Sequence, residues 1–195
     1  MTHRRLLLAL SLVLLAVSLP LSASQWIQLP FDQVVRESTY VVRGTVTNVY
    51  SAWDDAHETI FSYATVRVHR YIGGDAGPSV LMVREAGGTV GDYTQQAIGF
   101  PELREGEEVV LMLSKWDDGA DWRIHAYNQG KYLVRSFAGM EKLVEDPVKQ
   151  GDDRLAPSLA PRMQSESMAM SIDEFEEMVT AARAGRVQHV PNHRQ

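Results

Sequence analysis

The sequence predicts a mainly β fold: a five- to six-stranded antiparallel barrel with a short N-terminal helix and a C-terminal helix. Three segments, 40–51, 59–71 and 109–113, are rich in β-branched residues and place apolar residues at alternate or successive positions, a pattern typical of strands. Short clusters of Gly, Asp and Asn follow several of them, as expected of hairpin turns. Strands joined by hairpins pair antiparallel.

The elements follow in order along the chain. Residues 29–38 predict a short helix with Phe31, Val34 and Val35 on one face. The strand over 40–51 contains Gly44, and a glycine inside a strand often marks a bulge or a bend. The strand 59–71 ends in the breaker cluster 73–78. Further strands are expected at 80–83, 109–113, 122–127 and 131–134.

A long connection lies between Glu85 and Glu107, where the alternation stops and glycines accumulate. Connections of this length are unusual in compact domains and are often functional, and binding residues concentrate on loops held by a rigid scaffold. The binding residues that we predict here, together with a tryptophan in the turn after the next strand, are Tyr93, Gln95, Gln96, Phe100 and Trp116.

A second interpretation of the same connection stays open. In it, the segment folds back and closes the bottom of the barrel, with Ile98, Phe100 and Leu103 filling the core. Both interpretations can hold for different parts of the segment, since a loop that buries one side chain can expose the next.

The two ends of the chain predict its organisation. We expect a signal peptide at 1–24, an OB-like β-barrel domain at 25–144, a polar linker at 145–170, a helix at 171–185 and a flexible tail at 186–195. Ser171 and Glu174 form a capping-box pattern at the start of the helix. Its apolar residues, Ile172, Phe175, Val179 and Ala182, fall on one side, which favours packing against the barrel.

Export is predicted from the first residues. His3, Arg4 and Arg5 precede a largely apolar run that ends at Leu19, and small residues at 22–24 follow, the pattern of a cleavable signal peptide. The run is shorter than the roughly 20 residues that span a bilayer, so a retained membrane anchor is the lesser alternative. We expect cleavage after residue 23 or 24, no stable membrane anchor afterwards, and a periplasmic or extracellular location.

Composition restricts the partners. Removal of residues 1–24 takes away two arginines and no acids, so the net charge changes from −6 to −8. An acidic domain without a basic cluster argues against nucleic-acid binding, which depends on Lys and Arg. The chain has no cysteine, which excludes disulfides and lipid attachment through cysteine, so a hydrophobic core has to stabilise the domain.

The order of elements, with the strings Arg43-Gly44-Thr45-Val46 and Gly106-Glu107-Glu108-Val109-Val110-Leu111, resembles that of OB-fold, tissue-inhibitor-of-metalloproteinase-like and netrin-like modules. The resemblance covers about residues 30–136 and implies an OB-type barrel. Those animal inhibitors use an N-terminal cysteine to chelate the protease zinc, and this chain has none, so the resemblance does not carry their inhibitory residues. OB barrels also bind oligonucleotides and sugars.

The remaining chemistry is sparse, and we predict no catalytic residue, metal site or cofactor. His189 and His193 have the spacing of a helical metal pair, but Pro191 between them interrupts a helix. Asp117, Asp118 and Asp121 are better explained by a hairpin turn than by calcium. His69 and His125 lie on expected strands and could meet across a sheet, whereas Glu85 and Glu102 are expected to be solvated.

Two functions follow from these observations. The preferred one is an exported, non-catalytic binding or accessory module that contacts a protein or glycan partner. The alternative is a hydrolase acting on an envelope polymer, with residues such as Glu85 and His125 in acid/base roles.

Overall fold

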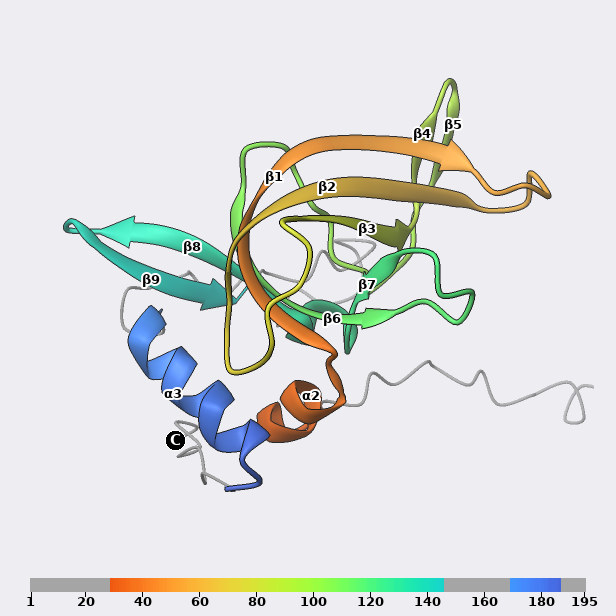
Figure 1. The fold of residues 1–195 in the computed structure, drawn as a ribbon. Coiled ribbons are helices and arrows are strands. Elements are labelled where there is room, and N and C mark those ends of the chain that lie inside the picture. Colours follow the sequence, from red (N-terminus) through yellow and green to blue (C-terminus); the bar gives the residue numbers. More distant parts are fainter. Residues whose placement is uncertain (1–28, 146–168, 187–195) are drawn as a thin grey trace, which may run out of the picture.

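The computed structural model describes residues 29–145 and 169–186 (Figure 1). The expected signal peptide, nearly all of the linker expected at 145–170, and most of the tail lie outside the described residues. Within the described parts, no helix is both long and apolar enough to cross a bilayer.

Five strands close a barrel in the order β1-β2-β3-β7-β6, with β6 pairing back onto β1. Their bounds are β1 Tyr40–Trp53, β2 Ile60–Tyr71, β3 Val80–Ala86, β6 Glu108–Lys115 and β7 Trp122–Ile124. This confirms the predicted barrel and is compatible with an OB-like fold. The barrel is mostly antiparallel, as expected, but its sheet is mixed, because β3 and β7 pair in parallel through Val83 and Trp122. In a closed ring with an odd number of strands, at least one pair of neighbouring strands has to be parallel.

Other strands extend or decorate the barrel. The sheet continues beyond β6 through β8 Lys131–Phe137, β9 Met140–Glu145 and the short β10 Met170–Ser171. The segment expected as a loop contains a separate hairpin made of β4 Gly88–Val90 and β5 Tyr93–Gln95. This hairpin projects from the barrel (Figure 1). A single turn of 3-10 helix, η1 Tyr127–Gly130, precedes β8.

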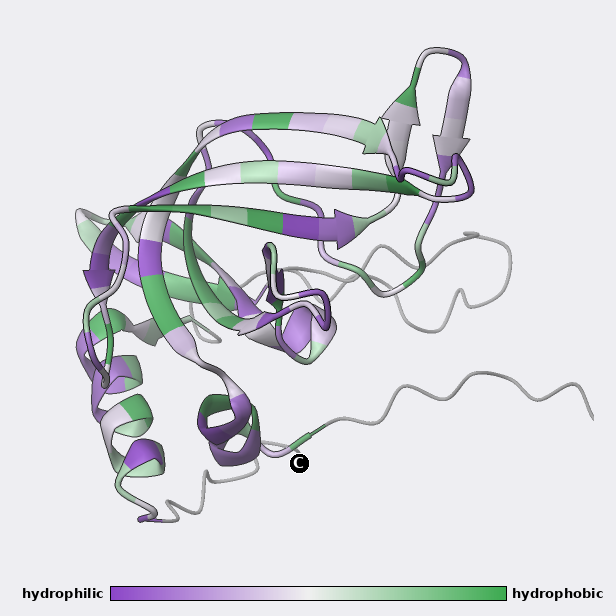
Figure 2. Cartoon of the chain, turned by 45° about the vertical axis from the view of Figure 1, so that its right-hand side comes forward, coloured by the Kyte–Doolittle hydropathy of each residue, from purple (hydrophilic) through white to green (hydrophobic). Residues whose placement is uncertain are grey.

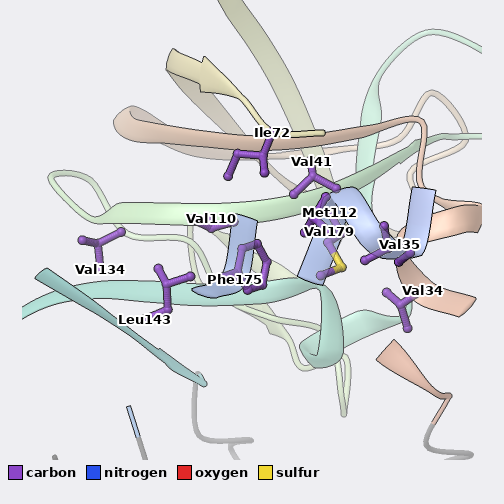
Figure 3. Close-up of a cluster of buried hydrophobic side chains, with 11 residues drawn as sticks. Val34, Val35, Val41, Ile72, Val110, Met112, Val134, Leu143, Phe175 and Val179 are labelled. Atoms are coloured by element: carbon purple, nitrogen blue, oxygen red, sulfur yellow. The ribbon is translucent and has the colours of Figure 1, made fainter. Parts of the chain in front are cut away.

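Two helices cover one outer wall of the barrel. They are α2 Phe31–Glu37 and α3 Ile172–Arg183. The Ser171 hydroxyl accepts a hydrogen bond from the Glu174 backbone N–H at 3.1 Å, which confirms the predicted cap. Phe175 and Val179 of α3 are fully buried in a cluster formed between the helices and β1, β6, β8 and β9 (Figure 3). Phe175 also packs edge-on against Phe31 and Tyr132.

A second cluster fills the barrel itself, with Val66, Val83 and Leu111 among its fully buried members. Hydrophobic and hydrophilic residues intermix along β1 and β2 (Figure 2), as the pleat requires. The predicted irregularity at Gly44 is present: the register between β1 and β2 shifts between Arg43 and Gly44. A Cβ at Gly44 would lie 2.6 Å from the Arg67 carbonyl oxygen, so the close approach of β2 requires glycine.

Candidate functional site

Three turns lie at the same end of the barrel: the turn between β1 and β2, the β4–β5 hairpin, and the turn between β6 and β7 (Figure 1). The β4–β5 hairpin is fixed to the first of these by backbone and side-chain contacts. The Gln95 side-chain oxygen accepts a hydrogen bond from the Ile60 backbone N–H at 2.7 Å, and the Gly87 N–H donates to the Ile60 carbonyl at 2.8 Å. The hairpin is therefore held in place although its tip projects.

Close packing at Gly88 completes this anchor. A Cβ on Gly88 would lie 2.4 Å from the Ser51 hydroxyl and 2.6 Å from the Ser62 hydroxyl, so the hairpin backbone lies directly against β1 and β2. The Ser62 hydroxyl also donates to the Gly87 carbonyl at 2.8 Å. Any larger residue at position 88 would push the hairpin away from the barrel.

Aromatic side chains gather where the hairpin meets the β1–β2 turn. Tyr93 on β5 is 66% exposed, and its ring lies edge-on to that of Trp53, with 5.8 Å between centroids. The His57 ring, in the turn between β1 and β2, lies nearly parallel to the Trp53 ring. On the opposite face of the hairpin, the Thr89 and Thr94 hydroxyls hydrogen-bond across the two strands at 2.9 Å. We call Tyr93, Trp53 and His57 the hairpin surface.

The predicted binding residues do not form one group. Tyr93 belongs to the hairpin surface and Gln96 is exposed, whereas the Gln95 side chain anchors the hairpin. Phe100 packs edge-on against Tyr127. Trp116 lies at the β6–β7 turn, where its indole N–H donates to the Arg84 carbonyl at 2.8 Å. Trp53 and His57 complete the surface, and only the three-dimensional contact of two separate hairpins identifies them together.

The rest of the long connection closes the barrel in part. Leu103 packs against the cluster inside the barrel, as the second interpretation expected, but Ile98 is 59% exposed. The fully buried Lys131 fixes the segment, because its ammonium group donates to the Glu102 carbonyl and lies 3.1 Å from a Glu107 carboxylate oxygen. The segment therefore combines a projecting hairpin with a barrel closure.

A cation packed among aromatic rings fastens β3 to the β6–β7 turn on the outside of the barrel. The Arg84 guanidinium lies 5.2 Å from the Phe61 ring centroid and 4.9 Å from that of Trp116. It forms ion pairs with Asp118 and Asp121. The two aspartates thus bind a protein cation, which explains an acidic turn here in structural terms.

Glu85 corrects the expectation that it is solvated. Only 5% of the residue is exposed, because Glu85 is in register with Ser62 on the inner face of β2 and β3. One of its carboxyl oxygens accepts a hydrogen bond from the Ile124 backbone N–H at 2.5 Å. Burial raises its pKa to about 8, opposed by that hydrogen bond and by the charge of Arg123. Glu85 is therefore protonated at neutral pH.

The pair suggested for acid/base work is separated by the barrel wall. Glu85 faces inward to Ile124, while His125, the residue that follows β7, faces outward and contacts Ser114 and Glu37. His69 lies elsewhere, with its ring nitrogen 2.7 Å from the Thr45 hydroxyl. His69 is on β2 as expected, but His125 follows the end of β7; the two histidines have different partners and do not meet.

Among residues 29–145 and 169–186, no group of three or more His, Asp or Glu side chains is arranged to hold a metal ion. The chain matches no protein-family model and no curated protein.

Proposed function

We propose that the mature chain is an exported binding or accessory module that contacts a protein or glycan partner through the hairpin surface, without a chemical step at that surface. The observation that carries this proposal is the exposed Tyr93 ring, held against Trp53 by a hairpin that is itself anchored to the barrel. Tyr and Trp supply large contact areas at low entropic cost and are common at recognition surfaces.

Rigidity supports a role in binding. The hydrogen bonds of Ile60 with Gln95 and Gly87 restrict the hairpin before any partner arrives, and a preorganised surface loses less conformational entropy on association. The β1–β2 turn that carries His57 corresponds in position to a loop with which OB folds bind ligands. The barrel thus offers the support that a small contact surface needs.

The finer resemblance to tissue-inhibitor-like and netrin-like modules adds no ligand to this proposal. Its inhibitory residues are cysteines, which the chain lacks. The binding proposal therefore depends on the hairpin surface alone.

Replacement of Tyr93 by Ser tests the surface. The ring is exposed, so we expect an unchanged unfolding midpoint but an affinity for the partner that falls about 5- to 30-fold, as for the loss of 1–2 kcal/mol at an aromatic contact. The partner is first captured from the native envelope with the wild-type mature chain, and its affinity for each variant is then measured. The matched control is Met140→Ser, because Met140 is 57% exposed on the distant β8–β9 hairpin.

Two outcomes would refute the surface: equal affinity of the Tyr93→Ser variant and the wild type, or an equal loss in the Met140→Ser control. Gln95 is left intact in this experiment, because its side chain bonds to the Ile60 backbone and its loss would release the hairpin.

Export has an independent test. We expect the mature protein to begin at Ser24 or Gln25, since the small residues 22–24 form the processing pattern. N-terminal sequencing of the protein recovered outside the cytoplasm checks this. Recovery of a chain that still begins at Met1 would contradict cleavage.

A further inference from the structure

A second group of polar side chains lies on the outer face of the barrel, away from the hairpin surface. Ser114 on β6 is in register with Arg123 on β7. Their chain neighbours Leu113 and Ile124 face the barrel core, so Ser114 and Arg123 face outward, as does His125 two residues after Arg123. Glu37 reaches this group from the last residue of α2, beside the barrel (Figure 1).

These side chains form a continuous chain of hydrogen bonds. The Ser114 hydroxyl lies 3.3 Å from Nδ1 of His125, and Nε2 of His125 lies 3.2 Å from a carboxylate oxygen of Glu37. With the proton on Nε2, the imidazole donates to Glu37 and accepts the serine proton at Nδ1. A hydroxyl beside a base that a third group orients is the arrangement of an activated nucleophile, and such contacts are often loose before a substrate binds.

The carboxylate is positioned to orient the ring. The Gln33 side chain donates to the other Glu37 oxygen at 2.9 Å. The hydrogen bonds from Gln33 and then from His125 lower the pKa of Glu37, so Glu37 is ionised at neutral pH. His125 itself is 17% exposed at its side chain, which leaves one edge of the group open to solvent.

Arg123 supplies a positive charge at the same hydroxyl. Its Nε donates to the Ser114 hydroxyl oxygen at 3.3 Å, and its guanidinium packs on Trp116 with 5.4 Å to the ring centroid. Among the residues that the structure describes, Arg123 forms no ion pair with a carboxylate, and the buried Glu85 nearby is protonated. Its charge is therefore available to a negative charge that develops beside Ser114.

We propose that Ser114, His125 and Arg123 form an esterase site in which Ser114 is the nucleophile, His125 the general base and acid, and Glu37 a positioning residue. The Ser114 oxygen attacks the ester carbonyl carbon while its proton passes to Nδ1 of His125, and Arg123 stabilises the oxyanion. The ester C–O bond then breaks, and the alcohol leaves with the proton from His125. Water attacks the acyl-serine by the same route, which releases the carboxylic acid and restores Ser114.

The position of the group determines how a substrate reaches it. It lies on the outer wall between α2 and the β6–β7 turn, so the ester has to reach it from solvent. Any solvent-accessible carboxylic ester, whether small or carried on a polymer, meets this requirement. This activity does not rest on the proposed binding function, because Tyr93 is not part of the group.

A fluorophosphonate tests the nucleophile directly, since its phosphorus bonds to an activated serine oxygen as fluoride leaves. We expect mass spectrometry of the labelled mature chain to locate the adduct on Ser114. Ser114→Ala should abolish labelling at that peptide, whereas Ser136→Ala, at an exposed serine on β8, should label as the wild type does. His125→Gln and His125→Ala should each slow labelling at least about 100-fold, and unfolding midpoints identify any variant that fails to fold.

Hydrolysis of p-nitrophenyl acetate tests the positioning residue. Because Glu37 does not touch the ester, Glu37→Gln should lower kcat with KM unchanged, an effect that a loss of packing alone would not produce. Ser136→Ala, at the exposed serine on β8, should hydrolyse the ester as the wild type does. Because no residue of the Ser114 group belongs to the hairpin surface, partner capture and ester hydrolysis are separate measurements, so failure of one proposal is distinguishable from failure of the other. The esterase site is refuted if the folded wild type gives no adduct on Ser114, or if a folded His125 variant labels at the wild-type rate.

Discussion

Replacement of Glu85 by Gln should remove a large part of the pH dependence of stability. The Glu85 carboxyl lies inside the barrel and accepts a hydrogen bond from the Ile124 N–H, next to the seam where β3 and β7 share the backbone pair Val83–Trp122. Gln has nearly the same shape and keeps an oxygen that can accept this bond. The substitution therefore removes the titration and retains the contact.

The direction in which stability changes with pH depends on whether the folded or the unfolded chain binds the proton. Burial raises the pKa of Glu85 from 4.5 to about 8 in the folded protein, so between these pH values the folded state holds a proton that the unfolded state has released. Stability therefore falls as pH rises through this window and levels off above it. One pKa unit corresponds to 1.36 kcal/mol, so the total loss is about 5 kcal/mol, of which about 3–4 kcal/mol develops between pH 5 and pH 8.

Urea unfolding of the mature chain at half-unit steps from pH 5 to pH 9 measures this effect. The quantity compared is the difference in unfolding free energy between wild type and Glu85→Gln, because contributions of other titrating groups then cancel. We expect this difference to change by about 3–4 kcal/mol between pH 5 and pH 8 in favour of the variant. Glu105→Gln, at an exposed position, should show no such change. A change below about 1 kcal/mol would refute a buried, protonated Glu85.

Three substitutions test the packing. Phe175→Ala should cost about 3–5 kcal/mol in urea unfolding because the buried ring joins α3 to α2 and β8, and an unchanged midpoint would mean that α3 is not docked. Gly44→Ala should cost about 1–3 kcal/mol, since its Cβ would overlap the Arg67 carbonyl; equal stability would exclude the close strand contact. Lys131→Met should cost about 3–5 kcal/mol of unfolding free energy, because Glu107 then loses its buried partner. Thermal unfolding at low and high salt measures the change, and a variant more stable than the wild type would contradict the prediction.

Most of the fold was predictable because it depends on sequence patterns that act over short distances along the chain. Strand alternation, the hairpin turns, the glycine at the β1 irregularity and the Ser171 cap all act between residues close in the chain. The β4–β5 hairpin was missed for the same reason: each strand is short, and the Gln95–Ile60 bond and Gly88 packing that hold it are contacts between distant segments.

The candidate sites were less predictable. Tyr93 was expected from its loop, but Trp53 joins it only because two hairpins meet. The Ser114–His125–Glu37 group combines the end of α2, strand β6 and the residue that follows β7, and no short motif carries it. Such a group forms only where residues distant in the chain lie on the same outer face of the barrel, and the spacing of residues in the sequence does not show which ones do.

The sequence by itself determined a β-rich, cysteine-free acidic chain with a capped C-terminal helix, because composition and local periodicity need no partner. Tertiary structure decided which face of each strand meets which core. Along β6, Val109 to Leu113 are all buried, since one face fills the barrel and the other packs under the helices. Because both faces of β6 are apolar, its sequence does not show which side chains point into the barrel and which point toward the helices. Closure of the five-stranded ring then brought the parallel seam, placed Glu85 inside and left His125 on the outer wall.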